Sequence, residues 1–295
     1  MTFPKFAYPA FRWFCRACAL CLAAALAGLF GFLLWRGLGT LGPSLFFGEA
    51  DPWRALLLRV PVMDGLWPAC LGTLSLLGLT CLLAVPVGIA AGVCLAEYAA
   101  GPAKAWLTFC VELLASIPSV VMGLFGFTLI LFLRRTILPT ANTCLLLAAG
   151  CLALLVLPYL VSATQKSLES LPESLRLIGP SLGLGTGRAI RHILLPASAR
   201  SILAGVILAV GRAAEDTAVI LLTGVVANAG APAGLAGKFE ALPFTIYSLA
   251  AQYQTPEELD RGYGAAMVLL ALTGSLFVGA HLLHATLRRR WQVNP

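Results

Sequence analysis

The sequence predicts an all-α, polytopic membrane protein with six transmembrane helices. Of its 295 residues 59% are hydrophobic and only 11% are charged, and the mean hydropathy of +0.90 lies well above that of soluble globular chains. A helix that crosses the hydrocarbon core needs about 20 mainly apolar residues. Runs of that length, bounded by charge, Pro or Gly, occur six times, at residues 17–35, 66–95, 105–133, 142–164, 199–223 and 264–287.

The first run follows Lys5, Arg12 and Arg16, as the apolar core of a secretory signal would. It is longer than the roughly 7 to 15 apolar residues of a signal core, and no A-x-A-like cleavage site closes it. We therefore expect a membrane anchor here. The residues that follow, 36–65, are punctuated by Pro and are expected to form an external connector.

The second and third runs contain Pro and Gly within otherwise apolar helices. Pro86 and Gly88 lie in the second run, and Pro118 and Gly123 lie in the third. In a membrane helix such residues permit kinks and the close approach of neighbouring backbones. We expect these four residues to act in helix packing or as hinges.

The fourth connection, residues 165–198, is the most informative polar segment. Apolar and charged residues alternate at helical spacing over residues 173–178, which predicts a short amphipathic helix at the membrane surface. Pro180 and the glycines after it predict the end of that helix. The stretch RAIRHILLP then predicts a second helix with Ile and Leu on one face and Arg on the other. Such a hairpin is either an interfacial element held by anionic lipid or a docking element for a cytoplasmic partner.

The fifth run carries three charges, Arg212, Glu215 and Asp216, in the stretch GRAAEDTAVILLTG. An ion near the bilayer centre costs at least about 2.5–3.5 kcal/mol and commonly marks a transport pathway. Arg212 and Asp216 would share one face of an unbroken helix, where an ion pair could lock two helices together. Alternatively, the guanidinium could bind a tetrahedral oxyanion bidentately, while the carboxylates accept the proton that hydrogen phosphate carries and sulfate lacks. We favour the second role for Arg212.

The last external loop and the final helix follow ordinary structural rules. Residues 242–253 are apolar and aromatic enough to rest on the membrane interface. Thr255, Pro256 and Glu258 then match a capping box with Pro at the first helical position. The final helix is therefore expected to begin outside the bilayer.

Positive charge predicts the orientation of the chain. Lys and Arg are more frequent in the segments that an even number of spans places inside, most clearly in residues 165–198 and 288–290. This bias predicts that both termini are cytoplasmic. The pI of about 9.1 then reflects topology and contact with membrane lipid, and we expect no nucleic acid partner.

No catalytic or metal-binding constellation emerges from the sequence. His192, His281 and His284 lie at span ends without clustered carboxylates, and the C-x2-C-x2-C run that begins at Cys15 lacks a fourth ligand. The G-x-G-x-G of residues 183–187 lacks the spacing of a dinucleotide fingerprint. We therefore expect a chain that is not an enzyme and binds no metal or cofactor.

Two stretches resemble motifs of a known family. In LGLGTGRAIRHILLP, residues 182–196, a Gly is followed ten residues on by Ile-x-Leu-Pro, which is similar to the cytoplasmic coupling motif of ABC-importer permeases. GRAAEDTA, residues 211–218, resembles the GRA-x-GETAP signature of phosphate importer permeases of the PstA type, and the likeness extends over residues 71–283. The chain departs from the two motifs at Leu177, Ile178 and Gly179, which replace Glu-Ala-Ala, and at Glu215, Asp216 and Val219, which replace Gly, Glu and Pro.

The resemblance implies the type I fold of ABC-importer permeases. Residues 1–70 would form an N-terminal cytoplasmic segment, the first helix and an external loop. Residues 71–287 would form the five-helix transporter domain with its coupling segment, 165–198, and residues 288–295 a cytoplasmic tail. The resemblance places in the substrate pathway Arg212, Glu215, Asp216 and Thr217, and in the contact with an ATPase Glu173, Arg176, Gly183, Arg188, Ile193, Leu195 and Pro196.

The same resemblance implies the permease subunit of an ATP-driven phosphate importer in a bacterial inner membrane. Its partners would be a second permease of the PstC type, two copies of a PstB-type cytoplasmic ATPase that uses ATP and Mg, and an external PstS-type phosphate-binding protein. One alternative is a permease for another oxyanion, such as sulfate, molybdate or phosphonate. A second is an ion-coupled secondary transporter, although the sequence shows no convincing internal repeat.

Overall fold

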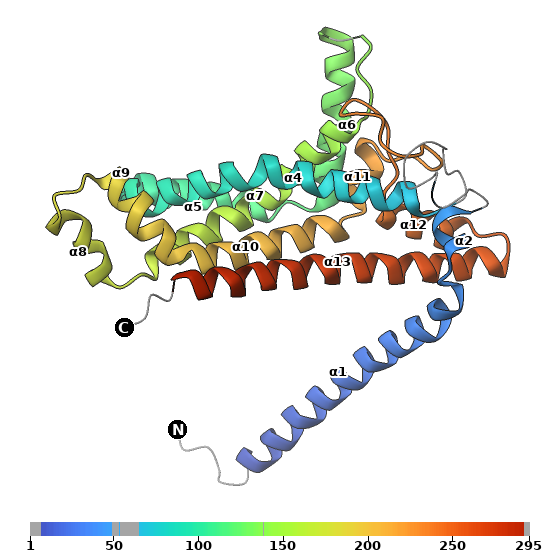
Figure 1. The fold of residues 1–295 in the computed structure, drawn as a ribbon, viewed down its shortest axis with the longest axis horizontal. Coiled ribbons are helices and arrows are strands. Elements are labelled where there is room, and N and C mark those ends of the chain that lie inside the picture. Colours follow the sequence, from blue (N-terminus) through green and yellow to red (C-terminus); the bar gives the residue numbers. More distant parts are fainter. Residues whose placement is uncertain (1–6, 49–52, 54–64, 138, 292–295) are drawn as a thin grey trace.

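The computed structural model describes residues 7–48, 53, 65–137 and 139–291, with side chains placed for residues 11–48, 53, 65–137, 139–279 and 282. Within this part of the chain six helical segments are long and apolar enough to cross a membrane, so the predicted all-α fold with six spans is confirmed. Four of the long helices lie side by side along the molecule (Figure 1): α4 (Trp67–Val93), α7 (Leu145–Glu169), α10 (Leu195–Glu215) and α13 (Pro256–Trp291).

The third span differs from the single helix predicted over residues 105–133. Two helices occupy this region, α5 (Gly101–Ala115) and α6 (Ser119–Thr136). Pro118 between them is extended, with φ −61° and ψ 141°. Its ring supplies no N–H and disfavours helical geometry at the preceding residue, so the chain breaks here. As a result α5 runs along the bundle, whereas α6 stands away from it (Figure 1).

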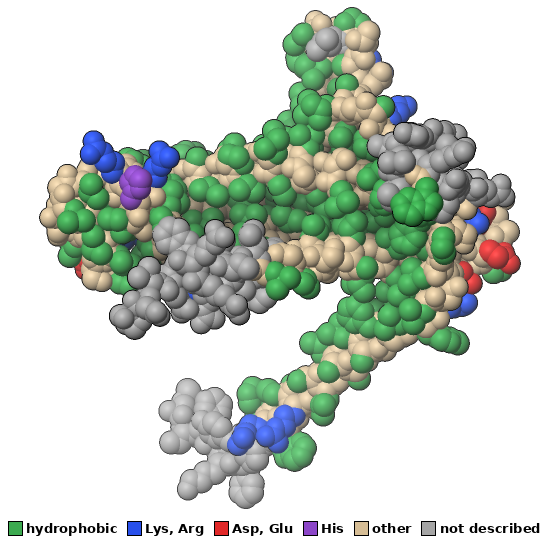
Figure 2. Space-filling model, in the orientation of Figure 1, with side chains coloured by type: hydrophobic (Ala, Val, Ile, Leu, Met, Phe, Trp, Pro, Cys, Tyr) green, Lys and Arg blue, Asp and Glu red, His purple; other side chains and the backbone are tan. Residues whose placement is uncertain are grey.

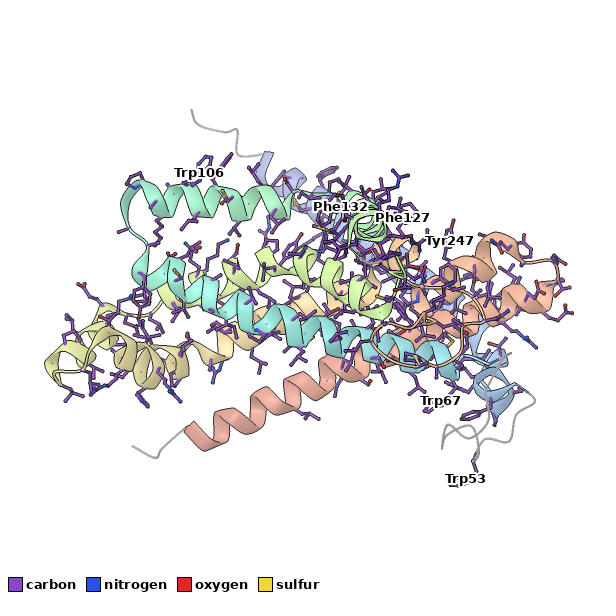
Figure 3. All side chains as sticks on the ribbon, turned by 90° about the horizontal axis from the view of Figure 1, so that it is seen from above. Trp53, Trp67, Trp106, Phe127, Phe132 and Tyr247 are labelled. Carbon is purple, nitrogen blue, oxygen red and sulfur yellow. The ribbon has the colours of Figure 1, made fainter. Side chains whose placement is uncertain are left out.

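One face of α6 packs on the bundle, and much of its outward side is apolar until Arg134 and Arg135 in its last turn. A Cβ added at Gly123 would lie only 2.9 Å from the carbonyl oxygen of Ala218, so this glycine permits the backbone approach that we expected of it. Phe127 and Phe132 on α6 are exposed, and Figure 3, which looks down this helix, shows both beside it.

The fifth span is also divided. α10 ends at Glu215, Asp216 is extended with φ −75° and ψ 114°, and α11 covers Ala218–Thr223. The backbone N–H of Val219 donates a hydrogen bond of 2.8 Å to Asp216 Oδ1, which is the way an Asp side chain caps a helix N-terminus. The unbroken helix predicted over residues 199–223 is therefore wrong, because Asp216 caps a new helix.

Glycine also sets the distance between α4 and α7. A Cβ at Gly88 would lie 2.6 Å from Cβ of Leu160, and one at Gly92 would lie 2.5 Å from Cβ of Thr164. No real Cβ tolerates these distances, so the two backbones pack closely because both positions lack a side chain. Pro86 lies inside α4 with an exposed ring, and the helix continues past it.

The chain between α11 and α12 (Leu242–Gln252) folds over the start of α7. The N–H groups of Leu145 and Leu146 donate to the carbonyls of Gly237 and Leu235 at 3.1 and 2.9 Å. A helix start leaves such N–H groups without partners inside the helix. This loop therefore completes the hydrogen bonding of α7 at its N-terminal end.

Glu240 is buried in the same loop. Glu240 is only 7% exposed. Its Oε1 accepts a hydrogen bond of 2.7 Å from the N–H of Gly230. Burial raises the pKa of Glu240, because it disfavours the charged form, and this outweighs the bonds from the backbone.

Replacing Glu240 with Gln should stabilise the protein at neutral pH. The folded protein binds the carboxyl proton more tightly than the unfolded chain does, so stability falls as the pH rises from the unfolded pKa through the raised folded pKa. Gln keeps an acceptor for Gly230 without the charge. Ala should instead destabilise by about 1–3 kcal/mol, because a buried N–H loses its partner. Thermal unfolding in detergent at several pH values measures both effects, and a Gln variant that keeps the parent pH profile would contradict the assignment.

The first helix, α1 (Ala7–Gly37), contacts α13 near its C-terminal end. Phe32 and Tyr263 meet edge to face with ring centroids 5.6 Å apart, and Arg36 Nη1 lies 3.3 Å from Asp260 Oδ1. Away from this contact α1 diverges from the bundle (Figure 1), and its apolar side chains are exposed.

The final helix begins as the sequence predicts. α13 starts at Pro256, the N–H of Glu258 donates to Thr255 Oγ1 at 3.3 Å, and Glu258 Oε2 accepts from the N–H of Gln254 at 2.8 Å. The bond to Thr255 confirms one half of the predicted capping box, whereas Glu258 reaches the N–H of Gln254, one residue before the N-cap, and not that of Thr255.

Charged residues gather at the two ends of the bundle. Arg188, Arg191 and His192 are exposed at the end that Figure 2 shows with Lys and Arg in blue and His in purple. Glu257, which is exposed, and Glu258, which is half-buried, lie in the first turn of α13 at the opposite end, where acidic side chains appear in red. The bundle therefore presents chemically different surfaces on the two sides of a membrane.

Candidate functional site

Arg212 lies in the last turn of α10, on a stripe of side chains that this chain leaves exposed. Ser201, Ala204, Leu208 and Glu215 lie on the same stripe, at the spacing of three or four residues that aligns side chains on a helix. An ionised residue in a membrane helix faces a bundle interior or a water-filled cavity. The stripe is therefore a candidate for the lining of a pathway.

The guanidinium of Arg212 rests on an aromatic ring. Its Cζ lies 4.7 Å from the ring centroid of Tyr159 on α7, within the range of a cation–π contact. The ion pairs found among the described residues do not include Arg212. Among these residues the N–H groups of the guanidinium therefore meet no carboxylate, and they can donate to a ligand.

The ion pair between Arg212 and Asp216, the alternative that we did not favour, does not form, for a simple geometric reason. The helix ends between them, and Asp216 Oδ1 accepts the N–H of Val219 instead. Thr217, the other residue expected in the pathway, is half-buried at the start of α11. The structure thus places Arg212 and Glu215 on one exposed face and gives Asp216 a capping role.

The coupling segment starts in the last turn of α7 and continues with α8 (Glu173–Ser181), whose first residue, Glu173, is exposed. The helix continues through Pro180, contrary to the predicted break, and the N–H of Leu182 still donates to the carbonyl of Ile178 at 3.1 Å. Gly183 ends it in the left-handed conformation with φ +67°, which glycine adopts without strain.

The second half of the segment leads directly into the fifth span. α9 (Thr186–Ala189) continues through a π turn (Ile190–Leu194) into α10. Ile190 and Leu194 are buried and Arg188 is exposed, which confirms the predicted faces. The remaining residues expected to contact an ATPase are half-buried, namely Ile193, Leu195 and Pro196, the last in the first turn of α10.

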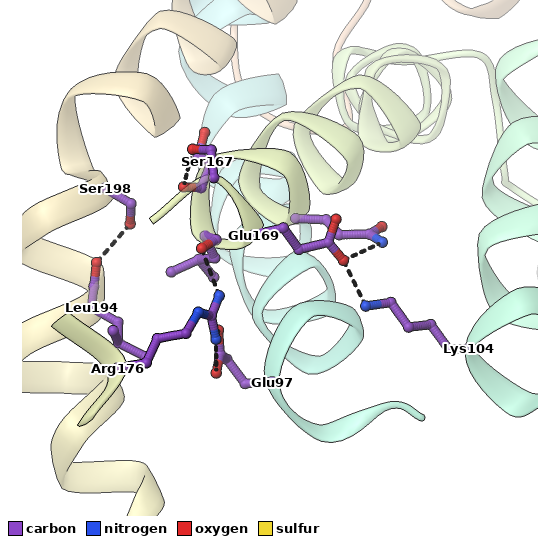
Figure 4. Close-up of polar contacts among 10 residues, drawn as sticks. Glu97, Lys104, Ser167, Glu169, Arg176, Leu194 and Ser198 are labelled. Atoms are coloured by element: carbon purple, nitrogen blue, oxygen red, sulfur yellow. Dashed lines mark hydrogen bonds and ion pairs between the residues drawn. The ribbon is translucent and has the colours of Figure 1, made fainter. Parts of the chain in front are cut away.

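Arg176 points inward, toward the ends of two spans (Figure 4). Its Nη1 donates to both carboxylate oxygens of Glu97, at 2.9 and 3.0 Å, and its Nη2 donates to the carbonyl of Leu168 at 2.7 Å. Glu97, whose side chain is 9% exposed, lies in the π turn Cys94–Tyr98 at the end of the second span. The contact therefore ties α8 to the ends of α4 and α7.

A second ion pair lies nearby and joins α5 to α7. Lys104 Nζ lies 2.6 Å from Glu169 Oε1, which also accepts from Gln165 Nε2 at 3.0 Å (Figure 4). The Lys104 and Glu169 side chains are 32% and 37% exposed, so water screens this pair more than the Arg176–Glu97 pair.

Residues 84–292 match the family model described as "Binding-protein-dependent transport system inner membrane component". The chain belongs to this family. The resemblance drawn from the coupling and GRA-type motifs is thereby confirmed, and the chain is a multi-pass inner membrane protein of the permease type.

Curated relatives of this permease extend over most of both chains. YqgI of Bacillus subtilis (strain 168), named a probable ABC transporter permease protein, is 30% identical over 70% of this chain and 66% of its own. The phosphate transport system permease protein PstA 1 of Mycobacterium tuberculosis strain H37Rv is 31% identical over 77% of this chain and 72% of its own. PstA of Yersinia pestis is 32% identical, with 79% and 77% covered.

Solved structures show that the permease has the fold of ABC importers. A chain of a bacterial ABC transporter involved in the import of alginate has a TM-score of 0.59 at 14% identity and covers 95% of this chain and 99% of its own. An inward-facing MetNI methionine ABC transporter chain has a TM-score of 0.54 at 17% identity, with 81% and 99% covered.

Two residues of the permease site were not found by sequence reasoning. Glu97 offered a usable signal, since it is a carboxylate at the end of an apolar run. Tyr159 offered none, because an aromatic side chain in an apolar helix usually belongs to the packing of the bundle. The partners of both residues, Arg176 and Arg212, lie on other helices and are known only from the packing of the bundle.

Proposed function

We propose that this permease is the transmembrane subunit of an ATP-driven importer of inorganic phosphate. The observation that carries the proposal is the guanidinium of Arg212, which lies on an exposed stripe of a membrane helix and has no carboxylate partner among the described residues. Its planar fork suits bidentate binding of a tetrahedral oxyanion. The relatives that are named phosphate transport permeases support phosphate as that anion.

Glu215 contributes discrimination between anions. It lies three residues from Arg212 on the same exposed stripe, and its carboxylate can accept a hydrogen bond only from an anion that still carries a hydroxyl. Hydrogen phosphate has such a hydroxyl near neutral pH and sulfate does not. A carboxylate beside the binding guanidinium therefore penalises sulfate, because it would face that ion without a shared proton.

The partners follow from the incomplete pathway and from the coupling segment. A second permease would complete the lining opposite Arg212, two copies of a cytoplasmic ATPase would use ATP and Mg, and an external binding protein would deliver phosphate. The end with exposed Arg188 and Arg191 is the cytoplasmic one under the positive-inside rule, so both termini are cytoplasmic.

Beside the exposed Glu173, the end of α8 offers an apolar patch to the ATPase. Leu177, Ile178 and Leu182 are 57%, 39% and 68% exposed. Leu177 stands at the position where the motif usually has Glu, so a charged contact is replaced by an apolar one. We therefore propose that the facing surface of the ATPase is also apolar.

Uptake of labelled phosphate into vesicles that hold the whole complex tests the proposal. Uptake should require ATP and should be inhibited by excess arsenate, which has the same charge and hydroxyl as phosphate. Excess sulfate or molybdate should leave at least about half of the uptake, because neither ion offers the proton that Glu215 accepts.

Two outcomes would contradict the proposal. Stronger inhibition by sulfate or molybdate than by arsenate would assign the permease to another oxyanion. Uptake that follows an ion gradient and does not need ATP would assign it to a different transport class.

A further inference from the structure

Tyr159 holds a defined position beside Arg212 because the residues around it are buried. Val156 and Leu160, one turn before it and the next residue after it, are each 2% exposed. Both belong to a buried cluster that includes Ala209 and Ala213 of α10. The ring of Tyr159 is itself half-buried, so it is supported from within the bundle and lies under the guanidinium of Arg212.

A close contact between α7 and α10, one turn from Tyr159 along α7, fixes how the two helices lie against each other. A Cβ placed on Gly205 would lie 2.4 Å from Cβ of Ala163, so the helices touch at this point only because α10 has a glycine there. Ala163 lies one turn from Tyr159, and Gly205 lies two turns from Arg212 on the antiparallel helix. This contact brings the ring of Tyr159 under the guanidinium.

The partner of Arg212 is an aromatic ring and not a carboxylate. The two kinds of partner differ in whether they leave the guanidinium able to bind an anion. A carboxylate would occupy the N–H groups that an incoming anion needs, and the anion would have to displace it. An aromatic face instead contacts the face of the guanidinium and leaves the N–H groups at its edge unused. Holding a long, flexible side chain in its binding conformation before the ligand arrives lowers the ordering cost of binding.

We propose that Tyr159 is a positioning residue, which holds the guanidinium of Arg212 by its ring so that the N–H edge faces the pathway. This inference rests on the proposed phosphate import. It assigns the effect to the aromatic ring and not to the hydroxyl. Phe should therefore replace Tyr159 successfully, whereas Leu, which has similar apolar character but no π face, should fail.

The test compares Tyr159→Phe with Tyr159→Leu in vesicles that contain the full complex and the loaded binding protein. Phosphate uptake and ATP hydrolysis are measured together. Tyr159→Leu should lower uptake about 10-fold while ATP hydrolysis stays within about twofold of the parent, because the complex still closes but retains the anion poorly. Tyr159→Phe should keep both rates within about twofold.

Leu157→Ala, which shortens another half-buried side chain of α7, serves as the packing control. It should lower the ratio of uptake to hydrolysis by less than about twofold.

Several outcomes would overturn the inference. These are normal uptake in Tyr159→Leu, equal loss of uptake in Tyr159→Phe and Tyr159→Leu, or a parallel loss of uptake and hydrolysis in Tyr159→Leu. Arg212→Met separates this inference from the proposed function. If Arg212→Met abolishes uptake and Tyr159→Leu does not reduce it, only the role of Tyr159 fails, whereas normal uptake in Arg212→Met removes the anion site itself.

Discussion

Replacing Arg212 with Met should reduce ATP-driven phosphate uptake at least about 100-fold while the complex still assembles. Met has a similar length and apolar stem but no charge and no N–H donors. A bidentate contact contains two charge-assisted hydrogen bonds, each contributing about 1.5–3 kcal/mol, and nothing else on the exposed stripe of α10 can replace them. Uptake by vesicles and co-purification of the partner subunits provide the two measurements.

A matched control for this variant is Arg200→Met. Arg200 is an exposed arginine on the same helix, nearer its N-terminal end, and its replacement removes the same charge without touching the proposed site. It should retain at least about half of the parent uptake, since exposed charges contribute little to stability. Arg212→Met with uptake close to that of the parent would sink the proposed anion site, whatever the control shows.

Replacing Arg176 with Met should uncouple ATP hydrolysis from transport and loosen α8. The change leaves the carboxylate of Glu97, whose side chain is 9% exposed, without its partner, and removes the bond to the carbonyl of Leu168. Breaking a buried ion pair from one side costs about 3–5 kcal/mol, and the 30% exposure of Arg176 favours the lower end. Hydrogen exchange of residues 173–181 and the ratio of phosphate transported to ATP hydrolysed measure the two effects.

The exchanged pair and the neighbouring ion pair supply the controls. Glu97→Arg combined with Arg176→Glu should recover part of the coupling, although the bond to Leu168 is lost. Lys104→Met breaks the more exposed pair with Glu169 and should cost less than about 1 kcal/mol. Unchanged exchange and coupling in Arg176→Met would show that α8 is held by its apolar contacts alone.

The spans were predictable from the sequence because membrane insertion depends on length and hydropathy, which are local quantities. The capping box at Thr255 and the buried face of Ile190 and Leu194 were predictable for the same reason, since each depends on residues within one or two turns. These features needed no knowledge of tertiary contacts.

The two helix breaks were missed because apolar composition continues across them. Pro118 can either kink a membrane helix or end it, and the outcome depends on the direction that the next helix takes. Asp216 can either pair with Arg212 or cap a new helix. The preference of Asp for N-cap positions was the available signal for the second choice, but the run of apolar residues on both sides favoured one long span.

The pairs that define the site were not predictable, because each joins residues far apart in the chain. Arg176 and Glu97 are 79 residues apart, and Tyr159 meets Arg212 across two different helices. Periodicity places a side chain on a face of its own helix, but it does not say which neighbouring helix covers that face. Gly88 of α4 and Gly205 of α10 let these helices pack closely on α7, and these close contacts are visible only in the assembled bundle.

The attachment of α1 has a consequence for the biosynthesis of the protein. Arg36 and Asp260, which join the first helix to the last, are separated by 224 residues. At a translation rate of about 5–20 residues per second, α1 waits roughly 10–45 seconds before its docking site on α13 leaves the ribosome. During that interval α1 lacks the contacts with Asp260 and Tyr263 that it makes in the folded chain. Docking of α1 on α13 is thus a late event, and a chain that terminates before Pro256 leaves its first helix without a place to bind.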